Sequence, residues 1–188
     1  MRKTSILLLA LCLNIPTWGQ TIVKDEVNSQ GERLIITSMD IARDFKDKEV
    51  FSVGLFATQT NDTEKFFLCI KVTSFEPYKI KLGSVLLMKT TNNEVVTLNA
   101  FSDYDASVRE VHDVNGYIFS DYSTIALYPI DKDQITTLTN GVLKIRQETF
   151  AGTHNKEYKK DKMGAFIKKD FELVSSALQK KKDIYDGF

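Results

Sequence analysis

One stretch of the chain gathers side chains that could do chemistry. Residues 103–113 read Asp-Tyr-Asp-Ala-Ser-Val-Arg-Glu-Val-His-Asp. Oxygen ligands this dense could hold Ca²⁺, which takes about six to eight of them. Two carboxylates could instead act as acid and base on a glycosidic bond. The candidate binding residues are Asp103, Tyr104, Asp105, Glu110, His112, Asp113 and, beyond the stretch, Tyr122.

The same stretch also has a simpler interpretation as a solvated hairpin or long loop. Its glycine and closing glutamate are out of place for an EF-hand. In the hairpin interpretation, Val108 and Val111 point inward while the polar residues face water. We therefore predict no metal site and no catalytic residue there, and keep a carboxylate-dependent, glycosidase-like hydrolase and a Ca-binding domain as alternatives.

Other sets of catalytic residues are missing from the sequence. The two histidines, His112 and His154, are expected in separate polar loops and lack metal-ligand spacing, which disfavours a zinc centre of the usual kinds. No Gly-x-Ser-x-Gly, Gly-x-Gly-x-x-Gly or phosphate-binding glycine loop is present. Cys69 lies in an apolar run and is predicted to be a buried thiol. We predict no cofactor and favour a non-enzyme.

Aromatic side chains offer a route to binding without catalysis. Tyr104, Tyr117, Phe119, Tyr122 and Tyr128 cluster between residues 104 and 128. We expect Phe119 and Tyr128 in the core, whereas core and surface positions stay equally open for Tyr104 and Tyr122. Tyrosines on a surface can bind glycans or peptides, since they combine an apolar ring with a hydroxyl.

The elements that must position these residues are mostly strands. Short runs rich in Val, Ile, Phe, Tyr and Thr alternate with Asn, Asp and Gly clusters, which is typical of an antiparallel β domain. The expected strands are 34–38, 50–58, 65–74, 84–90, 94–101, 117–119, 123–128 and 142–150. Turns are expected at Asn92-Asn93 and Asn115-Gly116, because these residue types tolerate positive φ.

Two helices complete the predicted fold. Asp131 and Gln134 have capping-box spacing ahead of a short helix near 131–138. Residues 162–182 carry an apolar stripe at steps of three and four, with Asp161 as a plausible cap. We predict a mainly β, α+β fold with a sandwich-like antiparallel core and a C-terminal amphipathic helix.

The N-terminus predicts export. Arg2 and Lys3 precede an apolar run at 6–13 that is too short to cross a bilayer as a helix, so residues 1–20 are interpreted as a signal peptide and no retained transmembrane span is expected. Residues 21–32 are expected to form an extended leader, and 33–188 a single domain. With 25 basic and 25 acidic residues, the chain lacks the basic surplus of a nucleic-acid binder.

Three segments carry a resemblance. Trp18-Gly19-Gln20, residues 127–135 (Leu-Tyr-Pro-Ile-Asp-Lys-Asp-Gln-Ile) and residues 141–146 (Gly-Val-Leu-Lys-Ile-Arg) resemble small exported, uncharacterised proteins of Bacteroidetes-type Gram-negative bacteria. The resemblance implies export and a fold, and no activity. We expect a non-catalytic binding or interaction module of the cell envelope, periplasmic or extracellular, whose partner is a glycan, a peptide or an envelope protein.

Overall fold

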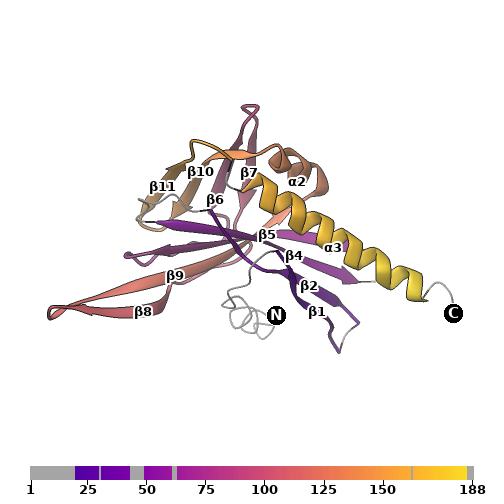
Figure 1. Cartoon of the computed structure of the whole chain (residues 1–188), viewed down its shortest axis with the longest axis horizontal. Coiled ribbons are helices and arrows are strands. Elements are labelled where there is room, and N and C mark those ends of the chain that lie inside the picture. Colours follow the sequence, from indigo (N-terminus) through magenta and orange to yellow (C-terminus); the bar gives the residue numbers. More distant parts are fainter. Residues whose placement is uncertain (1–19, 30, 43–48, 61–62, 162, 186–188) are drawn as a thin grey trace.

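A computed structural model of the chain describes residues 20–29, 31–42, 49–60, 63–161 and 163–185. The elements in chain order are β1 (Ile22–Val27), β2 (Arg33–Thr37), β3 (Asp40–Ala42), β4 (Val50–Thr60), β5 (Thr63–Ser74), β6 (Val85–Thr90), β7 (Val95–Asn99), β8 (Ser107–Val114), β9 (Tyr117–Ile130), α2 (Lys132–Thr139), β10 (Val142–Thr149), β11 (Gly152–Glu157) and α3 (Gly164–Tyr185) (Figure 1). Apart from Gln20, the predicted signal peptide lies outside the described residues.

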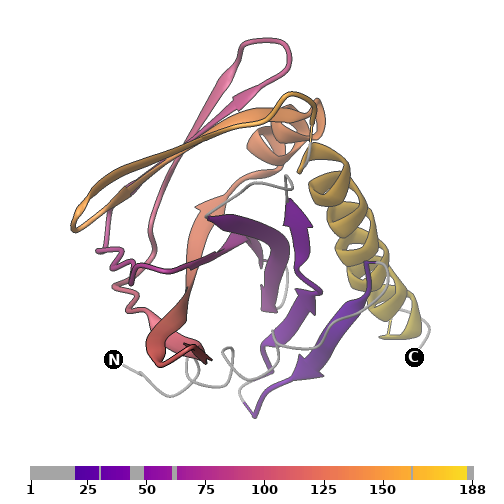
Figure 2. The same cartoon turned by 60° about the vertical axis from the view of Figure 1, so that its left-hand side comes forward.

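Within these ranges the strands form two antiparallel sheets. The larger has the order β1-β2-β4-β5-β9-β8, with β3 also beside β4, and the smaller has the order β11-β10-β6-β7. Figure 2 shows the β6–β7 and β10–β11 hairpins together above the larger sheet, and α3 alongside its first strands. These features confirm the predicted mainly β, α+β fold with a C-terminal helix.

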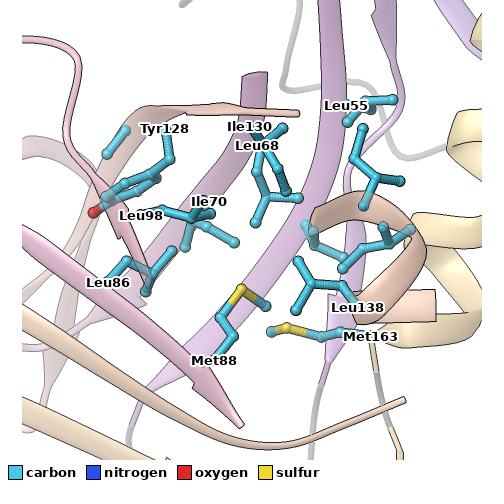
Figure 3. Packing of buried hydrophobic residues seen from close by; sticks show 14 of the residues in the cluster. Leu55, Leu68, Ile70, Leu86, Met88, Leu98, Tyr128, Ile130, Leu138 and Met163 are labelled. Atoms are coloured by element: carbon cyan, nitrogen blue, oxygen red, sulfur yellow. The ribbon is translucent and has the colours of Figure 1, made fainter. Parts of the chain in front are cut away.

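One hydrophobic core joins both sheets and both helices. Side chains from the larger sheet, including Leu68, Ile70 and Tyr128, meet Leu86 and Met88 of the smaller sheet (Figure 3). The helices complete this core with the buried side chains Leu138 of α2 and Ile167, Val174 and Leu178 of α3, together with Met163 just before α3. Burial of this apolar surface is the main stabilising contribution that the two layers share.

The alternation of β5 divides its side chains between two clusters, because neighbouring residues of a strand point to opposite faces. Leu68 and Ile70 enter the main core, whereas Phe67 and Cys69 join a smaller cluster on the other face with Leu127 of β9. Cys69 is buried, as predicted, and burial raises the pKa of its thiol to about 12. A thiol held protonated in this way is a poor nucleophile.

The start of α3 is fixed by Asp161, as predicted. Asp161 Oδ1 accepts hydrogen bonds from the N–H groups of Val142, Met163 and Gly164 at 2.8–3.0 Å. Burial alone would raise the pKa of this carboxyl, but the main-chain donors outweigh it and lower the pKa. The short helix has the predicted capping box between Asp131 and Gln134. Both caps satisfy N–H groups that lack intrahelical partners.

Four strands lie where no strand was predicted, among them the short β3, which pairs with β4 alone. β1 occupies the expected leader, β8 the acidic stretch and β11 the segment between the last predicted strand and the C-terminal helix. The expectation that His112 and His154 lie in loops is therefore wrong, because β8 and β11 contain them. Each lies at an edge of its sheet, paired on one side only. An edge strand does not need the strong apolar alternation of a half-buried strand, so its sequence gives a weaker signal.

Candidate functional site

The acidic stretch continues into a hairpin that extends away from the body of the protein (Figure 1). We call residues 107–122 the arm. Asn115 and Gly116 turn the chain at its tip with φ of 54° and 81°, as predicted, and Asp113 Oδ1 accepts a hydrogen bond from Gly116 N at 2.9 Å. Positive φ at both central residues suits the twist of a two-residue hairpin. The arm therefore displays two faces formed by alternate residues of β8 and β9.

One face of the arm carries three potential metal ligands. Glu110 lies opposite Asp121 in the strand pairing, and His112 follows Glu110 by two residues on the same face. His112 Nε2 lies 3.2 Å from Asp121 Oδ2 and 4.0 Å from Glu110 Oε2. All three ligand atoms lie within 4.8 Å of one another. Two of the predicted binding residues, Glu110 and His112, are thus brought together by the fold.

The other face of the arm is mainly apolar and open to solvent, although Asp113, opposite Ile118, and Ser120, opposite Val111, also lie on it. Val108, Val111 and Ile118 lie on it with exposed fractions of 59%, 61% and 75%, and Tyr122 stands opposite Val108 at its base. The expectation that Val108 and Val111 point inward is wrong, because this hairpin projects beyond the strands that could cover it (Figure 1). Contiguous exposed apolar side chains are typical of interaction surfaces.

The acids at the start of the stretch take other roles. Asp103 accepts a hydrogen bond from Leu82 N at 2.8 Å and lies 3.3 Å from Lys81 Nζ, and these two contacts lower its pKa in that order. Asp105 pairs with Lys79 at 3.2 Å. Both carboxylates therefore fix the linker before β8 to residues 79–82, and the fold does not unite them with Glu110.

The tyrosines divide between core and arm. Tyr104 packs against both hydrophobic clusters, and burial raises the pKa of its hydroxyl to about 12. Tyr128 is fully buried, as predicted, with its hydroxyl 2.8 Å from Gln147 Nε2. Tyr122 is half-buried at the base of the arm. The side chain of Phe119 lies outside the described residues.

Asp121 was not among the predicted site residues, although the sequence carries a signal for it. A two-residue turn pairs residues that are equidistant from it, so Asn115-Gly116 alone places Glu110 opposite Asp121. The prediction missed it because two short strands, 117–119 and 123–128, were expected where β9 runs unbroken through Asp121.

Two further acids, Asp170 on α3 and the half-buried Asp40 on β3, lie near each other. Asp170 is 0% exposed, and no hydrogen bond of good geometry reaches either of its carboxyl oxygens among the described residues, although the nearby Thr37 side chain acts to lower its pKa. Burial, with a smaller contribution from the nearby charge of Asp40, raises the pKa of Asp170 to about 8. Burial also raises the pKa of Asp40, against opposing effects of Gln20 and Lys169. Burial therefore favours the protonated form of Asp170 in the folded protein.

Asp170 also had a signal in the sequence. It lies three residues after Ile167 and four before Val174, which places it in the middle of the apolar stripe of α3. A polar residue on such a stripe is expected to be buried, and a buried carboxyl without partners is rare.

A shallow groove lies where β5 and β9 meet the start of α2. Its volume is about 640 Å³, and it is lined by Glu64, Lys65, Phe66, Phe67, Phe101, Pro129, Ile130, Asp131, Lys132 and Gln134. Glu64 is engaged by Lys132 Nζ at 2.8 Å, and Asp131 accepts from Gln134 N at 2.7 Å. These two carboxylates hold α2 in place, so the groove is a weaker candidate than the arm.

Comparison with family models, with curated proteins and with solved structures finds no match to this chain. In the part of the chain that the structure describes, no helix is long and apolar enough to cross a membrane. Function must therefore be argued from the surface of the molecule, where the arm combines exposed apolar residues with convergent ligand atoms.

Proposed function

We propose that the protein is an exported, non-catalytic interaction module of the cell envelope that binds a partner protein through the apolar face of its arm. The observation that carries this proposal is the exposure of Val108, Val111 and Ile118 on one side of a projecting hairpin. The N-terminal pattern and the resemblance to exported Bacteroidetes-type proteins support the envelope as its compartment.

A protein partner suits this surface better than a glycan or a charged ligand. The exposed groups on the apolar face are mainly aliphatic, and aliphatic side chains gain most by leaving water against another apolar surface. Sugar-binding sites rely on aromatic rings and hydrogen-bond donors, whereas the one tyrosine on this face is half-buried. β8 is also an edge strand, so its outer backbone groups can pair with an added strand.

Site-specific photo-crosslinking in cells that make the protein natively tests the proposal. Tyr117, at the tip of the arm, is replaced by the photoreactive amino acid p-benzoylphenylalanine. Phe150 is replaced in a matched control, because it is also aromatic and similarly exposed (76% against 78%) but lies at the end of β10. We expect one discrete protein adduct from position 117 and none from position 150.

A second change links that adduct to the apolar face. Combining Val111→Lys with Ile118→Lys places two charges on this face without filling any buried space. The adduct from position 117 should then disappear while the unfolding temperature stays close to that of the parent. An adduct that persists in this double variant contradicts binding through the apolar face, and one that position 150 gives equally contradicts specific binding by the arm. Export is tested separately, by the mass of the mature chain recovered from the envelope fraction.

A further inference from the structure

The polar face of the arm has a geometry that ion pairing alone explains poorly. A single imidazole nitrogen, His112 Nε2, lies near two carboxylates, 3.2 Å from Asp121 and 4.0 Å from Glu110. A neutral imidazole nitrogen offers either one N–H or one lone pair, so it cannot satisfy two acceptors together. Three potential electron-pair donors therefore converge on a small region.

The two carboxylates also differ from Asp103 and Asp105 at the start of the stretch. Asp103 and Asp105 are each paired with a lysine. In the described ranges, neither Glu110 nor Asp121 has a lysine or arginine within ion-pair distance. Their negative charge is thus left facing His112, and a cation at this position would stabilise both.

We propose that Glu110, His112 and Asp121 bind one divalent transition-metal ion, with Zn²⁺ as the best match. An imidazole nitrogen with two carboxylate oxygens suits zinc and its neighbours, whereas Ca²⁺ prefers an all-oxygen shell. Zinc ligands lie about 2.0–2.2 Å from the metal. Ligand atoms within 4.8 Å of one another can reach such distances through small rotations, and Glu110 is exposed enough to rotate. This differs from the Ca²⁺ alternative, because Asp103 and Asp105 take no part.

Three protein ligands leave a position for water or for a group on another molecule. The metal site lies on the face of the arm opposite Val111 and Ile118, so the two surfaces can be disrupted independently. The metal proposal does not depend on the partner proposal. Its failure would leave the apolar face untouched.

The competing explanation is a cross-strand ion pair in which a protonated His112 bridges the two carboxylates. His154 provides a matched control, because it faces a single carboxylate, Glu49 Oε1, at 3.3 Å and its ring packs against Tyr78. Removal of either histidine deletes one imidazole, but only His112 has two carboxylates within reach.

The test is a titration of the untagged full-length chain with Zn²⁺ by calorimetry and with Co²⁺ by visible absorption, which reports nitrogen and oxygen ligation. We expect one equivalent to bind to the parent and to His154→Ala. Binding should weaken by at least about tenfold in His112→Ala and in Asp121→Asn, since each removes a ligand. Circular dichroism without metal checks that each variant is folded.

Three results would overturn the proposal. One is the absence of Zn²⁺ binding below about 1 mM, which corresponds to a binding free energy of only about −4 kcal/mol. Another is equal weakening by His112→Ala and His154→Ala, which would mark nonspecific histidine binding. The third is saturable Ca²⁺ binding in place of Zn²⁺, which would assign the site to a different class of cation.

Discussion

β9 passes through two environments along one continuous strand. Its residues 122–130 pair with β5 and deliver Ala126, Tyr128 and Ile130 to the main core. Its residues 117–121 pair with β8 alone, and there Ile118 is 75% exposed. The two halves are continuous in backbone and similar in residue type. Whether an apolar side chain stabilises the fold or is available to a partner is therefore decided by what the fold places beside it.

The largest effect should come from making the same substitution in both halves. Ile130→Ala removes buried methyl groups and leaves a cavity, so it should lower the free energy of unfolding by about 2–5 kcal/mol. Ile118→Ala should change it by less than about 1 kcal/mol, the span of strand propensities. Urea unfolding midpoints measure both. Equal losses would show that the arm packs against the body, and would contradict the difference between the two halves of β9.

A somewhat smaller loss of stability is expected from a substitution at Gly164, where the packing is closest. A Cβ atom on Gly164 would lie 2.5 Å from Gly141 Cα and 2.8 Å from Leu138 O, at the junction of α2, β10 and α3. These are backbone atoms, which cannot move aside as a flexible side chain can. Gly164→Ala should therefore cost about 1–3 kcal/mol in thermal or urea unfolding. As a control, Gly164→Ala is compared with Ala165→Ser at the exposed next position, where no loss is expected.

The body of the protein should also lose stability as pH rises. The pKa of Asp170 is raised to about 8 in the folded protein, against an ordinary value near 3.8 in the unfolded chain. The protonated carboxyl therefore contributes stability that is fully present below about pH 4 and is lost progressively up to about pH 8. Unfolding temperatures at pH 5, 6.5 and 8 should fall in that order.

Asp170→Asn should flatten this pH dependence, because an amide keeps the shape of the protonated carboxyl without titrating. Asp103→Asn is the matched control, since Asp103 is exposed and its pKa is lowered. The unfolding temperature of the control should fall between pH 5 and 8 as steeply as that of the parent. If the unfolding temperature of Asp170→Asn falls as steeply as that of the parent, other titrating groups cause the pH dependence.

The smallest effect is expected from changing the apolar face of the arm while keeping β-branched residues. Val111→Thr with Ile118→Thr should leave the free energy of unfolding within about 0.5 kcal/mol of the parent, because both side chains are already in water. The same double variant should weaken the crosslink from position 117. A large loss of stability would mean that this face is structural rather than free to bind.

The sequence by itself determined the features that depend on local chemistry. The Asn-Gly turn, the capping box of Asp131 with Gln134, the cap at Asp161 and the buried runs of β4, β5 and β9 follow from residue types at short spacing. Strands and helix caps depend on residues that are close together in the chain. The α+β fold with its C-terminal helix could therefore be predicted.

Only the tertiary structure decided which faces are covered and which acids meet. It separated Asp103 and Asp105 from Glu110, brought Asp121 to His112, and buried Asp170 beside Asp40. It also left Val111 in water, although the same alternation of residues buries side chains elsewhere. The reason is that burial and charge pairing depend on surfaces that the fold brings together from distant parts of the sequence. An edge strand such as β8 pairs on one side only, and its own sequence does not show that its outer side stays open.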